Sequence, residues 1–322
     1  MIKIHASKTD DPLSDALSSL HMGSTVLGVF RMCEPWAIEH PKLEVVLSHI
    51  VLDGETWCYG DNLPTIHLRK GDLVTFPCGA SHSLASKPGL SGKPVASLLR
   101  SIGHRLWSPQ HHSMQPVRFS SGEGASNSLI LDIVSGVHEP CRNPLLCALP
   151  NILHVSAADH GLLPVVSLLI DTSGGDDALT APGYAAAARC LADLAFIQSV
   201  RAFLQTRDFA TKGCLRGLVH PRIGRALQAV HRNPGRNWTV ASLAAHANMS
   251  RSPFSSCFLE CVGQTPMNYV TQWRMHVAAR RLASGASLQL VSEELGYASP
   301  VTLSRTFTRV MGFSPTRISN PR

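Results

Sequence analysis

The sequence of 322 residues has no apolar run long enough to cross a bilayer and no apolar leader segment near its start. Its nine cysteines form neither the closely paired framework of a small disulfide-stabilised domain nor the Cys-x2-Cys spacing of a zinc site. These absences argue against a membrane protein and against a secreted disulfide scaffold. We therefore expect a cytoplasmic chain with reduced thiols and no membrane partner.

Lysine is missing from residues 221–322, and the acidic residues there are limited to Glu260, Glu293 and Glu294. The same segment holds twelve arginines, an excess of nine positive charges, whereas the rest of the chain holds 17 basic and 19 acidic residues. The net charge of +7 therefore belongs to this segment. A local surplus of this kind attracts a phosphate backbone and predicts salt-dependent DNA binding.

One pattern occurs twice in this basic segment. The copies read Ser250-Arg-Ser-Pro253-Phe254-x3-Phe258-x4-Gly263-x2-Pro266 and Ser299-Pro300-x2-Leu303-x3-Phe307-x4-Gly312-x2-Pro315. In each copy the serine predicts a helix N-cap, the apolar pair at spacing four predicts one buried face, and the glycine predicts the helix end. A shorter helical segment precedes each copy, so we predict two helix-turn-helix units in tandem. Two ordinary helical hairpins would not require this repeated order of cap, aromatic residue, glycine and proline.

Residues 221–322 resemble the AraC/XylS type of transcription regulator. The resemblance is carried by Trp238-Thr-Val, by Trp273-Arg274, and by the ending Gly296-Tyr297…Phe307…Gly312-x-Ser314-Pro315. It implies that both recognition helices enter adjacent major-groove segments on one face of double-stranded DNA, joined by a long helix at about residues 267–282. It also implies RNA polymerase and a second copy of the chain, in a homodimer, as partners.

The resemblance assigns base contacts to three positions on each recognition helix. These positions are Ser252, Ser255 and Ser256 on the first helix and Val301, Thr302 and Arg305 on the second. Arginine can donate to both major-groove acceptors of guanine and threonine can contact a thymine methyl group, whereas serine reaches less far. Arg251 and Arg309 are better suited to phosphates. An ion pair of Arg305 with Glu293 or Glu294 is the alternative to base contact.

The N-terminal part alternates β-rich runs with turn signals, which predicts an antiparallel barrel or sandwich. The runs are residues 25–30, 44–52, 56–59, 65–68, 73–76 and 128–134. Between them, Gly71-Asp72-x4-Pro77-x-Gly79-x2-His82 resembles the second motif of the cupin barrel. Together with residues 51–55 it resembles the cupin-like sensor domains found ahead of AraC-type motifs. Residues 86–127, rich in Gly, Ser, Pro and His, predict a long loop.

His82 matches the inward-facing metal ligand of catalytic cupins, but the rest of that ligand set is incomplete. Leu47 stands two positions before His49, where a second histidine is needed, and Glu55 lies about one position too far along the chain. We therefore expect no metal, no cofactor and no catalysis. The alternative from another class is a metal-dependent cupin enzyme with a DNA tether.

We expect the barrel to sense either a small molecule or a redox signal. The candidate effector pocket is lined by His49, Trp57, His67 and His82. The candidate redox pair is Cys141 and Cys147. The Ser135-Gly136 position lacks a thiol that relatives often carry, so structural, unreactive cysteines are the alternative.

A helical pattern over residues 182–204 carries one apolar stripe, which either pairs two subunits or packs against the chain's own barrel. We predict an α+β chain with a cupin-like antiparallel β-barrel over residues 1–150, a helical linker over 151–220 that is a candidate dimerisation region, and an all-α domain with two helix-turn-helix motifs over 221–322. The predicted function is a sequence-specific DNA-binding transcription regulator, located at the nucleoid in the cytoplasm, whose barrel responds to an unknown effector.

Overall fold

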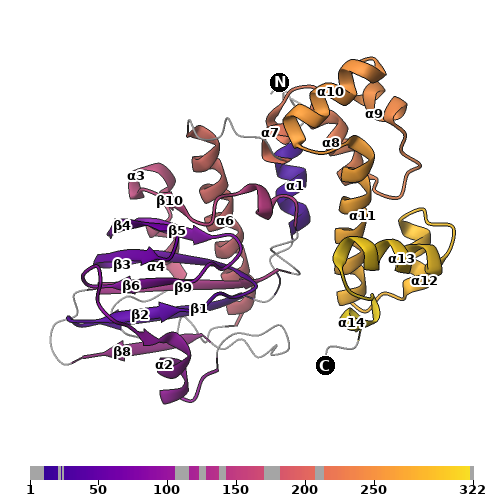
Figure 1. Ribbon diagram of the computed structural model, residues 1–322. Helices are drawn as coiled ribbons and strands as arrows, with labels where there is room; N and C mark the ends of the chain where they lie inside the picture. The colour runs from indigo at the N-terminus through magenta and orange to yellow at the C-terminus, as the bar shows by residue number, and fades with distance from the viewer. Residues whose placement is uncertain are drawn as a thin grey trace, which may run out of the picture. The chain divides into compact units, whose positions relative to one another are not determined.

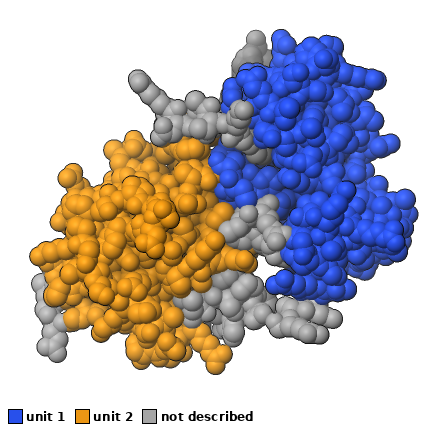
Figure 2. All heavy atoms as spheres, viewed as in Figure 1, with its two compact units in different colours: residues 1–21, 142–148, 210–322 blue, residues 22–141, 149–209 orange. Residues whose placement is uncertain are grey.

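The computed structural model describes residues 11–20, 23, 25–105, 116–122, 128–137, 143–169, 182–206 and 214–319. They form two compact units, which Figure 2 distinguishes by colour. One unit combines residues 1–21, 142–148 and 210–322, and the other combines 22–141 and 149–209. The predicted linker of residues 151–220 is thus divided between the two units. None of the helices in the described ranges has both the length and the apolar character that a bilayer span requires.

The barrel unit, residues 22–141 and 149–209, is built on one curled sheet (Figure 1). Its strands are β1 (Thr25–Met32), β2 (Ala37–His40), β3 (Val45–Gly60), β4 (Leu63–Arg69), β5 (Leu73–Phe76), β6 (His82–Ala85), β7 (Lys93–Pro94), β8 (Val117–Ser121), β9 (Ser128–Gly136) and β10 (Leu153–Val155). The main strand order is β7-β2-β6-β3-β9-β1-β8, while β4 and β5 also pair with β3, and β10 pairs with β5. Most pairs are antiparallel, as predicted for a cupin-like barrel, although β1–β8 and β2–β7 are parallel.

Strand β3 is the centre of the sheet because its 16 residues pair with β4, β5, β6 and β9. It merges two predicted strands into one. In its first half, Leu47 and Val51 pack in the core inside the curl, while Ile50 and Leu52 pack in a second core on the outer face. This alternation follows from the two-residue period of a strand that is buried on both faces.

Helix α6 (Tyr184–Gln205) covers the outer face of the sheet. Its buried residues Leu191 and Ala195 belong to the same core as Ile50 and Leu131 of the strands. Of the two alternatives for the apolar stripe, the structure therefore shows packing against the chain's own sheet. Within the described ranges the unit also contains the short helices α2 (Val95–Ser101), α3 (Ala157–His160) and α4 (Leu163–Leu169).

The second unit, which contains the basic segment, is helical and includes the N-terminal helix α1 (Pro12–Leu20). Its other elements are a 3-10 turn at Leu146–Ala148 and the helices α7 (Cys214–Val219), α8 (Ile223–Arg232), α9 (Val240–His246), α10 (Arg251–Val262), α11 (Pro266–Ala283), α12 (Leu288–Glu294), α13 (Pro300–Met311) and α14 (Thr316–Ser319). The pairs α9–α10 and α12–α13 confirm the two predicted helix-turn-helix units. Helix α11 joins them and extends the predicted helix by one residue at each end.

The ends of both second helices follow the sequence signals. Ser250 and Ser299 are the N-cap residues of α10 and α13, and Gly263 and Gly312 end these helices at φ 83° and 77°. Glycine tolerates this left-handed backbone because it has no Cβ. The Ser299 hydroxyl accepts a hydrogen bond from the Thr302 backbone N–H at 3.2 Å, whereas the Ser250 side chain makes no capping bond.

Several elements were not predicted from the sequence. Strands β2 and β6 have only four residues each, which is too short for a sequence pattern to identify them with ease. The loop prediction for residues 86–127 is wrong where β7, α2 and β8 form. Residues 106–115 and 123–127 lie outside the described residues.

Candidate functional site

Helices α10 and α13 turn their predicted base-reading positions outward. Their inner faces hold Phe254, Phe258, Leu303 and Phe307, all of which are buried. On the outer faces, the residues Ser252, Ser256, Val301, Thr302 and Arg305 are exposed, and the predicted phosphate contacts Arg251 and Arg309 are exposed as well. The exposure of Val301 reaches 59%, although its side chain is apolar. Ser255 is half-buried, and its hydroxyl donates to the Arg251 carbonyl oxygen at 2.9 Å.

The alternative role for Arg305, an ion pair with a nearby carboxylate, is not what the described residues show. Glu294 is engaged by Arg281, whose Nε donates to the carboxylate at 2.8 Å. Glu293 accepts a hydrogen bond from the Gln289 side chain. Within the ranges that the structure describes, neither carboxylate pairs with Arg305, so its guanidinium is available for another partner.

Arg274, in the Trp273-Arg274 motif of α11, contacts both the loop ahead of the first helix-turn-helix unit and Tyr297 of the second helix-turn-helix unit. The Arg274 guanidinium donates to the carbonyl oxygens of Pro234 and Arg236 at 2.8 and 2.9 Å. Its carbon also lies 5.5 Å from the centre of the Tyr297 ring. Arg274 thus has a structural role within this unit.

A close backbone contact also joins the loop ahead of the first helix-turn-helix unit to the turn of the second one. Gly296 has φ +70°, and a Cβ added there would lie 2.3 Å from the Gly235 carbonyl oxygen. A Cβ at Gly235 would meet the Glu294 oxygen at 2.0 Å. The two chain segments approach so closely that only glycine fits at either position. Together with Arg274, this contact holds the two recognition helices in a fixed relation.

Four buried polar side chains meet inside the curl of the sheet in the barrel unit. They are three histidines and one aspartate, and each comes from a different strand. His40 of β2, His49 of β3, His82 of β6 and Asp132 of β9 are at most 5% exposed. The cross-strand register explains the meeting, because His40 is paired with His82 and His49 with Asp132. Each histidine offers one potential ligand atom, and these atoms all lie within 4.8 Å of one another.

The hydrogen bonds of the cluster define which ring nitrogens face each other. His82 Nδ1 lies 2.7 Å from the Ala80 carbonyl oxygen, and His49 Nδ1 lies 2.6 Å from Asp132 Oδ1. The Nε2 atoms of His49 and His82 then face each other at 2.8 Å. His40 stacks on His82 with ring centres 4.8 Å apart, and its Nε2 is 4.0 Å from the second Asp132 oxygen.

Burial favours the uncharged form of each group in the cluster. It lowers the pKa of His49 to about 3 and, together with the charge of His49, holds the pKa of His82 well below its usual value. Burial and the neighbouring His82 likewise lower the pKa of His40. Burial raises the pKa of Asp132 to about 7, against an opposing attraction from His40. Desolvation of the charged form is the main cause in each case.

The four predicted pocket residues do not all lie together. His49 and His82 are in the cluster, whereas Trp57 and His67 stack on each other with ring centres 4.4 Å apart. The β3 register pairs Trp57 with His67, while the adjacent Cys58, of opposite orientation, belongs to the inner core. His67 Nε2 is 3.1 Å from Glu55, whose side chain is exposed. Trp57 and His67 therefore lie on the other face of the sheet.

Sequence reasoning did not single out His40 or Asp132. A usable signal was present in β2, where Ile38 and His40 share a face by the two-residue period. The signal was missed because β2 itself was not predicted. Asp132 also carried a signal, because it is an acidic residue within the apolar run of β9. A carboxylate in such a buried strand needs a polar partner nearby.

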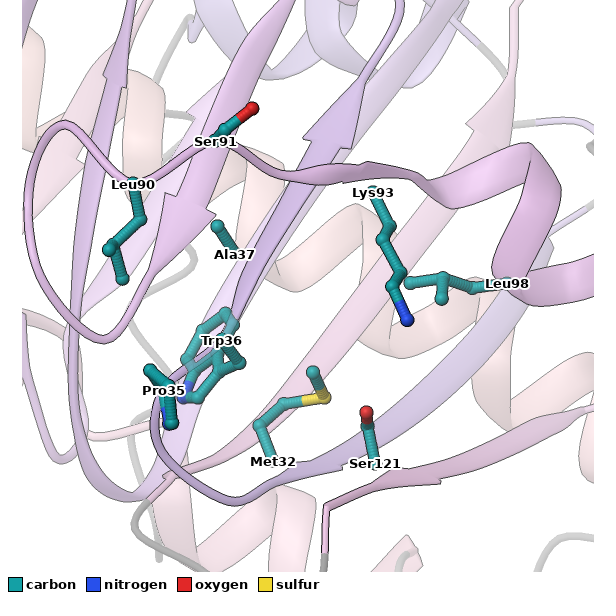
Figure 3. A pocket seen from close by; sticks show the side chains of 9 residues that line it. All are labelled: Met32, Pro35, Trp36, Ala37, Leu90, Ser91, Lys93, Leu98 and Ser121. Atoms are coloured by element: carbon teal, nitrogen blue, oxygen red, sulfur yellow. The ribbon is translucent and has the colours of Figure 1, made fainter.

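Two cavities open near the barrel interior. One, of about 730 Å³, is lined by Glu39, His40, Pro41, Tyr59, Gly60, Asp61, Thr65, Ser81, His82, Ser83, Pro94 and Ala96. The other, of about 260 Å³, is shown in Figure 3, where Lys93 extends toward Met32 and Ser121. The buried Trp36 indole lines this second cavity, and its N–H has no hydrogen-bond partner among the described residues. An ammonium group beside apolar side chains suits a ligand with a polar head and an apolar body.

The predicted redox pair is described only in part, because Cys141 lies outside the described residues. Cys147 is exposed. In contrast, burial raises the pKa of the Cys58 thiol to about 12, which keeps that side chain protonated and unreactive. Redox sensing through Cys141 and Cys147 stays a prediction.

Comparison with known proteins covers nearly the whole chain. Residues 11–205 match a family model described as a cupin, and residues 243–320 match one described as a helix-turn-helix domain. The chain is 37% identical over 314 residues to an AraC-like transcription regulator of Streptomyces antibioticus, covering 95% of this chain and 97% of that protein. It is 33% identical to the RCS-specific HTH-type transcriptional activator RclR of Escherichia coli, covering 94% and 95%.

Two more distant proteins also align over most of their length. The HTH-type transcriptional regulator AlkR of Acinetobacter baylyi is 28% identical, with 95% of this chain and 97% of AlkR covered. The solved structure of ToxT from Vibrio cholerae is 12% identical, with 92% of this chain and 97% of ToxT covered and a TM-score of 0.36. The latter similarity is too low for an inference about function.

Proposed function

The chain belongs to the AraC-type transcription regulators with an N-terminal cupin domain, and we propose that it reads specific DNA sequences in response to a signal received by that domain. DNA binding is supported chiefly by helices α10 and α13, whose proposed base-reading positions are largely exposed. Helix α11 joins these two helices within one compact unit. The twelve arginines of residues 221–322 supply the attraction to the phosphate backbone.

Base reading is assigned to three positions on each of these helices. Arg305, free of Glu293 and Glu294, can donate to the O6 and N7 acceptors of a guanine. Thr302 and Val301 beside it can contact thymine methyl groups. On α10 the three serines Ser252, Ser255 and Ser256 reach less far, so this half of the site depends more on bridging water and DNA shape.

We assign signal reception to the barrel unit and its cavities. The support is the cavity of Figure 3, which Trp36 and Met32 line with apolar surface and to which Lys93 supplies a positive charge. A small molecule with an anionic or carbonyl head would pair with the Lys93 ammonium group, and its apolar part would lie against Met32 and Trp36. A signal through Cys147 and Cys141 is the second candidate, supported by the exposure of the Cys147 thiol.

The remaining parts of the proposal follow from family membership. RNA polymerase and a second copy of the chain are the protein partners, and the nucleoid in the cytoplasm is the location. The E. coli relative RclR is named as an activator, which supports activation as the sign of regulation. A catalytic role for the barrel is the alternative, and turnover of a bound molecule by the purified protein would establish it.

The test is genome-wide DNA occupancy of the tagged full-length chain, combined with transcript changes after deletion of its gene. A short, directly repeated or asymmetric motif upstream of a few responsive genes is the expected result. The control is a chain with both Arg305 and Arg251 changed to alanine, which should lose the motif while its abundance is unchanged. Diffuse occupancy with no responsive gene contradicts the proposal.

A further inference from the structure

We propose that the barrel interior binds one first-row divalent transition-metal ion through a ring nitrogen of each of His40, His49 and His82, with Asp132 as the hydrogen-bonded partner that orients His49. This site goes beyond the proposed DNA reading and does not depend on it. The incomplete sequence motif predicted no metal here, because Leu47 replaces one expected histidine. In the fold, His40 from β2 supplies the third imidazole instead.

The first argument is the direction of the free lone pairs. A carbonyl oxygen only accepts, so the bond to Ala80 places the proton of His82 on Nδ1 and leaves Nε2 bare. With Asp132 ionised, the bond at 2.6 Å places the proton of His49 on Nδ1 as well. Two bare Nε2 atoms then oppose each other at 2.8 Å. In this state two acceptors oppose each other, and a cation bound between them would satisfy both.

The second argument concerns the character of these partners. Metal-bound histidines commonly donate their other ring N–H to a carboxylate or a backbone carbonyl, which fixes the tautomer and the ring orientation. His49 and His82 have one such partner each. Two nitrogens on one tetrahedral zinc ion lie about 3.3 Å apart, as follows from the usual bond length. A small outward shift of the rings therefore admits an ion.

The class of metal follows from the ligands. Three imidazoles suit zinc, copper, iron or nickel, whereas calcium and magnesium require oxygen ligands. His40 and His82 also line the cavity of about 730 Å³, which provides a route to the site. With three protein ligands, one coordination position is left open to a water molecule or an effector from that cavity.

The metal-free alternative is a proton chain. In it, a protonated Asp132 donates to His49 Nδ1, and His49 Nε2–H donates to His82 Nε2. This series of hydrogen bonds pairs the ring nitrogens of His49 and His82. It does not include His40, although the His40 ring packs against both other rings. A metal ion uses all three imidazoles.

A second group of potential ligands, His220, Cys257 and Cys261, also lies within 4.8 Å in the helical unit. It fits a metal less well. His220 Nδ1 accepts hydrogen bonds from the backbone N–H groups of Arg222 and Ile223, at 3.3 and 3.2 Å. The proton of the neutral ring is therefore on Nε2, the atom 3.9 Å from the Cys257 sulfur. This cluster must be separated from the barrel site in any experiment.

The experiment uses the full-length protein, stripped with a chelator and then titrated with Co²⁺ or Zn²⁺ alone. We expect about one equivalent of tightly bound metal, a visible Co²⁺ spectrum without sulfur-to-metal charge transfer, and a higher melting temperature with Zn²⁺. His40→Gln and His82→Gln should each lose this ion. His67→Gln is the matched control, since His67 lies on the other face of the sheet, and it should bind like the unchanged protein.

Asp132→Asn keeps the three ligands and should weaken Zn²⁺ binding by about 10–100-fold without abolishing it. A Cys257→Ser variant should bind the ion unchanged. Circular dichroism verifies the fold of each variant, and the result for the unchanged protein stands even if one variant fails to fold. The proposal is overturned if the unchanged protein takes up no stoichiometric metal, if His40→Gln retains it, or if the Co²⁺ spectrum shows sulfur ligation that Cys257→Ser removes.

Discussion

Replacing Gly296 with alanine should destabilise the helical unit, residues 1–21, 142–148 and 210–322, for two reasons. One is the left-handed backbone at this position, and the other is a clash of the added Cβ. The backbone at Gly296 has φ +70°, which costs a residue with a Cβ roughly 1–2 kcal/mol. The added Cβ would also lie 2.3 Å from the Gly235 carbonyl oxygen, and this neighbour is backbone rather than a flexible side chain. Relieving such overpacking typically costs about 1–3 kcal/mol more.

Gly285 provides the matched control for this substitution. It has φ +88° and follows α11, but a Cβ there would meet nothing within 4 Å. Gly285→Ala therefore carries the backbone cost without the clash. The difference between the two variants, about 1–3 kcal/mol, isolates the contact between Gly296 of the second helix-turn-helix unit and the loop ahead of the first.

The assay is differential scanning calorimetry of the full-length protein. The melting temperature to compare is that of the transition that shifts in both variants. A further loss of 1 kcal/mol lowers the melting temperature by roughly 4 °C in a unit of this size. Gly296→Ala should also weaken binding to the two-part operator more than to a DNA fragment that holds one half-site. Equal melting temperatures for the two variants would refute the packing argument.

Three other predictions concern the DNA-binding residues and a helix cap. Arg305→Ala should cost about 1–3 kcal/mol on the specific site, or about 5–150-fold in Kd, and relax selectivity at one base pair; an unchanged base preference in a binding-site selection excludes base reading. Arg251→Ala should weaken binding to all sequences alike and reduce the slope of log K against log salt by about one, so a loss confined to the operator contradicts a phosphate contact. Ser299→Ala should cost about 1 kcal/mol of unfolding free energy in chemical denaturation because its hydroxyl caps α13. Ser250→Ala should cost only a few tenths, since Ser250 makes no capping bond, and equal losses would show that the cap is not the cause.

The cupin resemblance was correct in kind but misleading about the interior of the barrel. The motif ending in His82 placed this residue inside the sheet, where the structure has it. The same reasoning grouped Trp57 and His67 with it, yet these two stack on the other face. A register shift in β3 between Val51 and Asp53 changes which later residues face inward. Such a shift cannot be read from alternation alone.

The sequence by itself determined the two helix-turn-helix units, their joining helix and the location of the positive charge. N-caps, apolar spacing and terminal glycines act between residues a few positions apart, so their pattern in the chain is sufficient. Only the tertiary structure decided that His40, His49, His82 and Asp132 meet. These four residues come from four separate strands, and strand pairing between distant segments, together with the curl of the sheet, brings their side chains to one point.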